Sequence, residues 1–295
     1  MTGTGARQSR EIWDEHSDAR YLLNERIGIG ATAEVFRGTD LRDGRPVAIK
    51  VAALAEDRHR VRLAAEAALM AGVRHPALVR FVDQGTAAPD CPWPGRAFLV
   101  QELVYGSSLA ERIRSGPAPG TEVAPWAVGL LSGLRHLHAR GIVHRDIKPA
   151  NLLLSHLRKC PVRIVDFGIA APAGTRPEPG TSSGTVQYMS PEQAGGGVVR
   201  PADDIYALGL VLLECLTGAK AFPGTAIESL VARTQRSPAI PRHLGAPWES
   251  LLESMTAMHA ADRPTALEAT AEAAMLLQPP HPLRRRVAAR SGSYC

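Results

Sequence analysis

One polar octet, HRDIKPAN, runs from His144 to Asn151 and is followed at once by an apolar run of leucines. Within it, Arg145 and Asp146 place opposite charges side by side, Lys148 adds a third charge two residues on, and the amide of Asn151 closes the group. A second carboxylate, Asp166, ends the apolar run VRIV in VRIVDFG. The octet therefore either holds a reacting substrate or only punctuates a loop before a buried strand.

A glycine-rich stretch, IGIGATAEVFRG, offers a second chemical feature at the end of a strand-like segment. Gly28 and Gly30 would let the backbone approach a phosphate closely, with amide N–H groups as donors. The stretch lacks the Gly-Lys-Ser/Thr ending of a P-loop, and a strand follows where a dinucleotide fingerprint requires a helix. Taken alone, a glycine-rich hairpin turn explains it equally well.

The bulk composition sets limits on the class of protein. The 295 residues are 45% hydrophobic, enough for a sizeable core, and the net charge of +5 is too mild to indicate a nucleic-acid partner. No apolar leader opens the chain and no window is long enough to cross a bilayer. The four cysteines are scattered without metal-ligand spacing, which favours free thiols in a reducing, cytoplasmic compartment.

The elements that must position these residues divide the chain into two unequal parts. Strand-like runs dominate from Tyr21 to about Leu103, including a hairpin around a polar Asp-Gly turn and one helix within EDRHRVRLAAEAALMAG. Helical patterns dominate after Tyr105, with short strands only around NLLL and VRIVDFG. The sequence predicts an α+β fold of two lobes, a small β-rich N-lobe and a larger α-helical C-lobe.

Five motifs in order make the chain resemble one family. VAIK ends at Lys50, Glu66 lies on the helix that follows, and then come HRDIKPAN, DFG at Asp166 and SPE at Glu192. Together with the glycine-rich turn between two strands, they are similar to the motifs of bacterial, eukaryotic-like (Hanks-type) serine/threonine protein kinases. The resemblance implies a kinase domain over 21–278, with the N-lobe at 21–103 and the C-lobe at 104–278. Residues 1–20 would then be an N-terminal extension, and 279–295 a basic tail.

The resemblance also implies a role for each matched residue in an ATP-dependent transfer. Asp146, Lys148, Lys50 and Glu66 would be catalytic, with Glu66 holding Lys50 on the phosphates. Asn151 and Asp166 would bind Mg²⁺, with Mn²⁺ as an alternative. The expected nucleotide contacts are Ile27, Gly28, Gly30, Val35, Ala48, Lys50, Glu102, Val104 and Leu153. Gln101 precedes residues 102–104, the segment that would link the two lobes and is called the hinge. A bulky apolar residue is more usual in the family at this position.

Substrate class and regulation follow from the same resemblance. DIKPAN, with Lys148, is similar to the serine/threonine pattern, so protein serine and threonine hydroxyls are the expected acceptors. The stretch between DFG and SPE would be the activation segment, and Arg145 would pair with a phosphate on it. The regulatory candidates in that segment are Thr181, Ser182, Ser183 and Thr185.

Structural roles and rival functions complete the expectations. Glu192 and Arg263 resemble a buried ion pair, and Asp204 resembles the aspartate that hydrogen-bonds the catalytic loop. A homodimer would allow phosphorylation in trans. A pseudokinase that only binds, or a protein whose basic tail contacts a nucleic acid or membrane surface, remains as an alternative.

Overall fold

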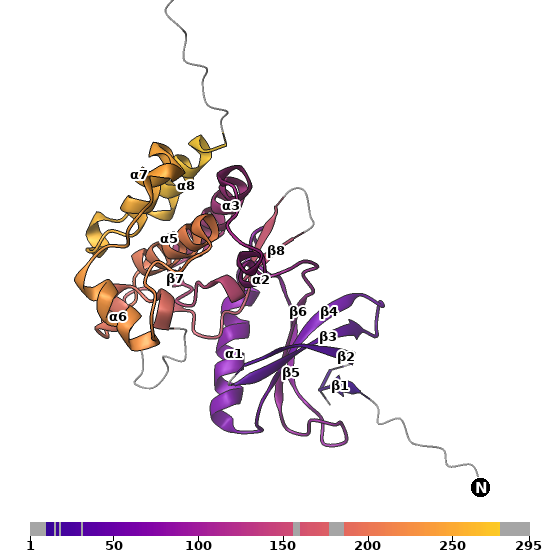
Figure 1. The fold of residues 1–295 in the computed structure, drawn as a ribbon. Coiled ribbons are helices and arrows are strands. Elements are labelled where there is room, and N and C mark those ends of the chain that lie inside the picture. Colours follow the sequence, from indigo (N-terminus) through magenta and orange to yellow (C-terminus); the bar gives the residue numbers. More distant parts are fainter. Residues whose placement is uncertain are drawn as a thin grey trace, which may run out of the picture.

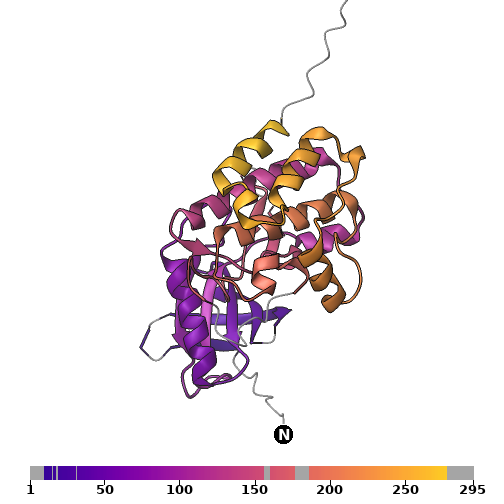
Figure 2. The same ribbon diagram turned by 90° about the vertical axis from the view of Figure 1, so that its left-hand side faces the viewer.

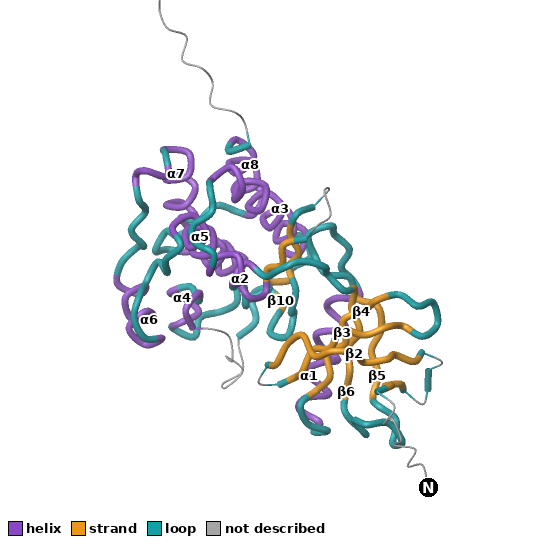
Figure 3. Tube along the Cα trace, turned by 45° about the vertical axis from the view of Figure 1, so that its right-hand side comes forward, coloured by secondary structure: helices purple, strands orange, loops and turns teal. Residues whose placement is uncertain are grey.

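The computed structural model describes residues 10–14, 16–17, 19–30, 32–155, 160–176 and 186–277. These residues form two lobes, and Figure 1 shows the strands of the smaller lobe below and to the right of the helices of the larger one. Figure 3 shows the same division by secondary structure, with strands concentrated in one lobe and helices in the other. The predicted α+β, two-lobed fold is therefore confirmed.

The N-lobe is an antiparallel sheet of six strands in the order β1-β2-β3-β4-β6-β5. The helix α1 (Asp57–Ala71) crosses one face and contacts β5 and β6. The hairpin predicted around the Asp-Gly turn is β3 paired with β4, where Val35 lies opposite Lys50. The strands are β1 (Glu11–Trp13), β2 (Arg20–Ile29), β3 (Ala33–Asp40), β4 (Pro46–Ala52), β5 (Phe81–Thr86) and β6 (Ala97–Glu102).

The alternation of side chains along β4 decides which residues face the other lobe. Val47, Ile49 and Val51 point into a small core on the face of the sheet away from α1. Ala48 and Lys50, being out of phase with them, point to the opposite face, where the two lobes meet. Because side chains alternate between the two faces of a strand, Lys50 lies on the face that lines the cavity between the lobes.

The C-lobe is built around the central helix α5 (Pro201–Thr217), in which every residue from Asp203 to Leu216 is buried. The helix α3 (Gly120–His138) packs against α5 and α8, and Figure 2 shows these helices stacked above the N-lobe. The other elements of this lobe are α2 (Leu109–Arg114), α4 (Pro191–Ala194), α6 (Ala226–Gln235), α7 (Ala246–Met255), α8 (Ala266–Met275) and the short 3₁₀ helices η2 (Val186–Tyr188), η3 (Arg242–Leu244) and η4 (Ala260–Asp262).

Two short hairpins and a 3₁₀ turn carry the loops that face the N-lobe. The strand β7 (Ile142–Val143) pairs with β10 (Ala171–Pro172), and β8 (Leu152–Leu154) pairs with β9 (Val162–Ile164). The 3₁₀ helix η1 (Pro149–Asn151) leads directly into β8. HRDIKPAN therefore runs from the end of β7 through η1, and DFG follows β9.

Several short elements were not predicted from the sequence. The strand β1 lies in the part expected to be an N-terminal extension, and its Ile12 is fully buried against the N-lobe sheet. The helices α2 and α6 were also missed, and α7 ends at Met255 although the helical pattern of WESLLESMTAMHA continues to Ala260. Each of these elements is ten residues or shorter, so each offers little periodicity to detect.

Candidate active site

A cavity of about 460 Å³ lies between the lobes. The N-lobe side of the cavity is lined by β2, β3, β4 and α1. The C-lobe side is lined by residues of HRDIKPAN, called the catalytic loop below, and by the DFG motif after β9. The hinge, residues 102–104 after β6, joins the two sides. Every residue predicted to be catalytic or to bind nucleotide or metal is among its lining residues: Ile27, Gly28, Gly30, Val35, Ala48, Lys50, Glu66, Glu102, Val104, Asp146, Lys148, Asn151, Leu153 and Asp166.

The ammonium of Lys50 is held between two carboxylates. Its Nζ lies 2.7 Å from Glu66 Oε2 and 2.7 Å from Asp166 Oδ1. Glu66 reaches this point because it shares the buried face of α1 with Leu63 and Met70. Its side chain is only 1% exposed, so the charge that it carries needs Lys50 as a partner. The network fixes the lysine at a single place in the cavity wall.

The same contacts set the ionisation of the cluster. Burial by itself would raise the pKa of Asp166, but the charge and hydrogen bond of Lys50 outweigh it and lower that pKa from 3.8 to about 2. Burial alone would lower the pKa of Lys50, but Glu66 and Asp166 together raise it above 10.5. Asp166 is therefore an anion and Lys50 a cation at neutral pH.

DFG has the conformation that turns Asp166 into the cavity. Asp166 has a left-handed backbone φ of 66°, and its Oδ1 accepts a hydrogen bond from Gly168 N at 3.3 Å. The next residue, Phe167, is 1% exposed and packs edge-on against the ring of His144 at 5.1 Å. With Phe167 buried below, the carboxylate of Asp166 is directed toward Lys50.

The catalytic loop gathers the predicted base and its neighbours around one carboxylate. Asp146 Oδ2 accepts hydrogen bonds from Lys148 Nζ at 2.7 Å and from Asn151 Nδ2 at 2.9 Å. Asn151 Nδ2 also donates to the Asp146 carbonyl at 2.9 Å, so its amide nitrogen is engaged within the loop. Asp146, Lys148 and Asn151 are thus held as one unit that faces Lys50 and Asp166 across the cavity.

The backbone of this loop is anchored by Asp204, as expected. Asp204 Oδ2 accepts from His144 N and Oδ1 from Arg145 N, each at 2.8 Å, while His138 Nε2 lies 2.8 Å from Oδ2. Burial would raise the pKa of Asp204, but these hydrogen bonds and the nearby histidines lower it. The anchor holds Arg145 at a left-handed φ of 66°, which a non-glycine residue seldom adopts without support.

The chemistry of the donor set fits a divalent cation. Asp166 is ionised, and the amide nitrogen of Asn151 is engaged, which leaves an oxygen on each of these two side chains as the available donor. Among the described residues, no three His, Cys, Asp or Glu side chains are grouped to hold a metal by themselves. Proteins usually bind Mg²⁺ through one or two side-chain oxygens together with phosphate oxygens of the substrate.

Arg145 and the activation segment are described only in part. Arg145 donates from its guanidinium to the Ile169 carbonyl at 3.2 Å, which places it beneath the start of the segment. The regulatory candidates Thr181, Ser182, Ser183 and Thr185 lie outside the described residues. Pairing of Arg145 with a phosphate there stays a prediction.

The end of the segment is fixed to the C-lobe by buried polar contacts. Arg263, with a fully buried side chain, lies 2.9 Å from Glu192 Oε2, which is the expected ion pair. Ser190 opens the SPE motif, in which the related kinases more usually carry an alanine. It is also an N-cap that accepts from Gln193 N at 3.1 Å and donates to Asp203 Oδ1 at 2.6 Å. The buried carboxylate of Asp203 is the partner that the motif alone did not reveal.

Two further cavity residues were not given roles by the sequence. Arg62 donates from Nε to the Gly168 carbonyl at 3.0 Å and so ties α1 to DFG. It lies four residues before Glu66, and this i, i+4 spacing on one helix face was the signal that could have identified it. Gln101 lines the cavity, and its buried Oε1 has no hydrogen-bond partner among the described residues.

The sequence matches a known family over most of its length. The model of the protein kinase domain matches residues 21–275. The serine/threonine-protein kinase PknL of Mycobacterium tuberculosis is 36% identical over 258 residues, covering 83% of this chain and 62% of PknL. PknB of M. tuberculosis is 38% identical over 242 residues, with 78% of this chain and 38% of PknB covered.

A relative from a different genus gives a similar result. The serine/threonine-protein kinase pkn2 of Myxococcus xanthus is 35% identical over 241 residues, covering 78% of this chain and 28% of pkn2. The chain thus spans at most about three fifths of the length of these relatives. Within the described part of the chain, no helix is long and apolar enough to cross a membrane.

Proposed function

Because the chain belongs to the protein kinase family, we propose that it transfers the γ-phosphoryl group of ATP to serine and threonine hydroxyls of proteins. One observation carries this proposal. A cation fixed by two carboxylates, Lys50, faces a base-and-lysine pair, Asp146 and Lys148, across one cavity of about 460 Å³. Phosphoryl transfer depends mainly on positioning and electrostatics, which this arrangement supplies.

Each side chain has a role in the proposed transfer. Lys50, fixed by Glu66, neutralises the α- and β-phosphates of ATP. Asp146 orients the acceptor hydroxyl and receives its proton, while Lys148 stabilises the charge that develops on the moving phosphoryl group. Asn151 and Asp166 would hold Mg²⁺, with Mn²⁺ as the alternative, and such a cation would further neutralise the phosphate oxygens.

The nucleotide base has a complementary place in the same cavity. Val35 and Ala48 from the N-lobe and Leu153 from the C-lobe line it, so an adenine ring would lie between apolar side chains. The hinge from Glu102 to Val104 offers backbone groups for the edge of the ring. Ile27, Gly28 and Gly30 line the cavity from the β2 side, where the triphosphate would be covered.

Acceptor class is supported by residues and by relatives. Lys148 stands within DIKPAN, which resembles the serine/threonine pattern, and the relatives PknL and PknB are both named serine/threonine-protein kinases. Autophosphorylation within residues 170–190 through a homodimer, and a cytoplasmic location, belong to this proposal as well. The intact charged residues Lys50, Glu66, Asp146 and Asp166 argue against a pseudokinase.

The test is incubation of the purified chain with labelled ATP and Mg²⁺, alone and with a generic basic protein. We expect labelling of phosphoserine and phosphothreonine, and its loss in Asp146→Asn. The exposed Asp262→Asn serves as the matched control and should retain full activity. Binding of Mg-ATP without any transfer would contradict the proposal in favour of a pseudokinase, and phosphotyrosine as the main product would contradict the acceptor class.

Mass spectrometry of the same reaction tests the proposed regulation. Phosphate should appear between residues 170 and 190 in the active protein and be absent from Asp146→Asn. A segment without phosphate in an otherwise active enzyme would contradict activation-segment autophosphorylation alone.

A further inference from the structure

One uncharged polar side chain, Gln101, lines the cavity between the lobes close to the hinge. It lies on β6, one residue before the hinge begins. The same cavity is lined by the apolar side chains of Leu63, Val79 and Val165. A glutamine carries an amide oxygen that accepts hydrogen bonds and an NH₂ group that donates them. Both ends of this amide therefore need partners that an apolar side chain would not need.

The register of the sheet places Gln101 beside the expected position of the nucleotide base. Gln101 of β6 lies directly opposite Ala48 of β4, and two residues further along Leu99 lies opposite Lys50. Residues directly opposite one another in an antiparallel pair share a face, with Cβ atoms about 5 Å apart. Two residues along a strand span about 7 Å. Gln101 is therefore level with Ala48, on the hinge side of the lysine that would hold the phosphates.

The amide of Gln101 makes no hydrogen bond to the described residues. Its Oε1 is buried and has no partner among them, whereas Nε2 is not one of the buried atoms that lack a partner. The residue as a whole is partly exposed, and it lines the cavity. Its neighbours across the sheet, Ala48 and Phe81, are apolar and offer no side-chain partner. The NH₂ group is therefore the accessible end of the amide, and it faces the cavity.

An unpaired amide at this place is unfavourable for the nucleotide-free protein. Buried polar groups are nearly always hydrogen-bonded, and one that is left without a partner is destabilising. The sheet supplies no partner for Gln101, as its apolar neighbours show. A ligand in the cavity can supply the missing partner for the accessible end.

A purine offers such a partner at position 6, on the edge that would lie against the hinge. In adenine this position carries an amino group with two N–H donors. When one of them bonds to a backbone carbonyl of the hinge, the other is left for a side chain next to the hinge. In guanine and hypoxanthine the same position carries a carbonyl oxygen, which accepts hydrogen bonds and cannot donate them.

We propose that Gln101 hydrogen-bonds the group at position 6 of the purine, and so lets the cavity bind 6-oxopurine nucleoside triphosphates as well as ATP. In the orientation of this structure, Nε2 donates to a 6-oxo group. Half a turn of the terminal amide presents its oxygen to a 6-amino group at the same place, and terminal amide torsions are roughly two-fold. The proposal rests on the proposed use of ATP and adds a second class of phosphoryl donor to it.

The hinge by itself would favour ATP. A hinge carbonyl accepts from the 6-amino group of adenine, but it opposes a 6-oxo group, because both are acceptors. The NH₂ group of Gln101 is a donor that offsets this mismatch. One neutral hydrogen bond changes affinity by about three- to tenfold. We therefore expect ITP, the nucleotide of hypoxanthine, to bind within about tenfold of ATP.

The test is isothermal titration calorimetry of the purified chain with three nucleotides in the presence of Mg²⁺. Their β,γ-imido analogues are used so that no phosphoryl transfer occurs. ATP carries an amino group at position 6, ITP an oxo group, and purine riboside triphosphate only hydrogen. Gln101→Met should weaken ITP about tenfold and ATP about threefold, because the hinge still bonds the amino group of ATP. Purine riboside triphosphate has no group for Gln101 to contact, so its affinity should stay within about twofold.

A matched control makes the same change of residue type elsewhere on the sheet. Gln84 is exposed on β5 and is not among the residues that line the cavity. Gln84→Met should therefore leave the affinities of all three nucleotides unchanged. Unchanged binding of purine riboside triphosphate to Gln101→Met shows that the cavity of this variant is intact.

Two results would overturn the proposal. One is equal weakening of all three nucleotides by Gln101→Met, because the residue would then act only on the shape of the cavity. The other is binding of ITP to the unmodified protein more than about tenfold more weakly than ATP. Failure of the proposed function gives a different result. If the nucleotides bind and labelled ATP gives no transfer, the proposed kinase activity is contradicted, while selective loss of ITP in Gln101→Met still supports the contact.

Discussion

Replacing Asp204 by asparagine tests whether one buried carboxylate holds the catalytic loop. Asp204 Oδ2 faces two donors, His144 N and His138 Nε2, and Oδ1 faces Arg145 N. In Asp204→Asn the side chain has nearly the same shape, but an NH₂ group replaces one oxygen and the negative charge is lost. His138 can change tautomer and accept from the new NH₂ group, whereas the N–H of His144 cannot.

The magnitude follows from these contacts. An unpaired buried N–H at His144 costs about 1–3 kcal/mol, and loss of charge from the remaining bond to Arg145 adds about 1 kcal/mol. The free energy of unfolding should therefore fall by about 2–4 kcal/mol. If half of this appears as a shift away from the active loop conformation, kcat falls about 5- to 30-fold. The KM for ATP should stay within about twofold, because Lys50 and the hinge are untouched.

Steady-state kinetics and thermal unfolding measure both effects on the same sample. The melting temperature should fall by at least about 4 °C for a domain of this size. Asp262→Asn, an exposed carboxylate of the same lobe, is the control and should change neither quantity. The argument is refuted if Asp204→Asn keeps kcat within twofold and its melting temperature within one degree of the unmodified protein.

Three other substitutions test separate contacts. The pKa of Asp166 is lowered to about 2, so its contribution to the free energy of unfolding is present above the ordinary value of 3.8 and is lost as the pH falls toward 2. In acid titrations followed by circular dichroism, Asp166→Asn should therefore lose stability less steeply between these two pH values than the unmodified protein does. An equal slope would contradict the role of Lys50. Gln101→Met removes a buried oxygen without a partner among the described residues, and should raise the melting temperature of the nucleotide-free protein by about 2–4 °C; a decrease would show that the amide is satisfied. Ser190→Ala removes an N-cap and the hydrogen bond to Asp203, and should lower the free energy of unfolding by about 1–3 kcal/mol in urea titrations, whereas a loss below about 0.5 kcal/mol would contradict that account.

The grouping of the candidate site residues in one cavity was predictable because these residues occur in ordered motifs on elements with strong patterns. The alternation along β4 places Lys50 on the cavity face, and the buried face of α1 carries Glu66 toward it. All the predicted nucleotide, metal and catalytic residues line one cavity as a result. Their chemical roles stay predictions until phosphoryl transfer is measured.

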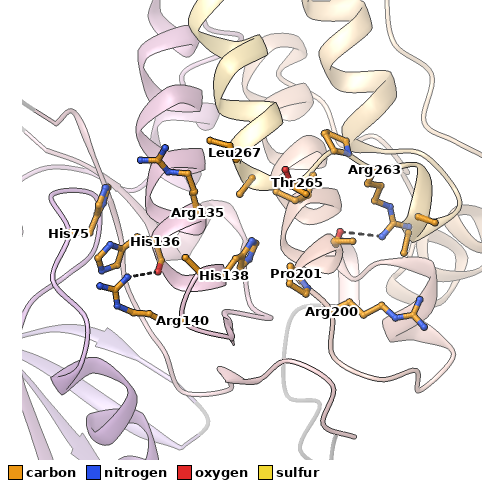
Figure 4. A pocket seen from close by; sticks show the side chains of 17 residues that line it. His75, Arg135, His136, His138, Arg140, Arg200, Pro201, Arg263, Thr265 and Leu267 are labelled. Atoms are coloured by element: carbon orange, nitrogen blue, oxygen red, sulfur yellow. Dashed lines mark hydrogen bonds between the residues drawn. The ribbon is translucent and has the colours of Figure 1, made fainter.

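Features that depend on contacts between distant segments could not be predicted. The strand β1 is three residues long, and its place in the sheet depends on pairing with Tyr21 and burial of Ile12. The bond from Ser190 to Asp203 joins two motifs whose separation in the sequence says nothing of their distance in space. A hollow of about 960 Å³ on the C-lobe (Figure 4) is lined by four stretches of chain whose proximity in space no local sequence pattern reveals.

Backbone strain and buried charge occur together at two loops of the candidate site, those that carry Arg145 and Asp166. Arg145 and Asp166 are the non-glycine residues with positive φ in the described part of the chain, each at 66°. Arg145 is held by the carboxylate of Asp204 through its backbone N–H, and Asp166 is held by the ammonium of Lys50 through its side chain. Since a strained residue persists only when its surroundings hold it, removing either charge should first let the loop relax and only then weaken the fold. Local relaxation of this kind predicts that loop substitutions reduce activity more steeply than they reduce stability.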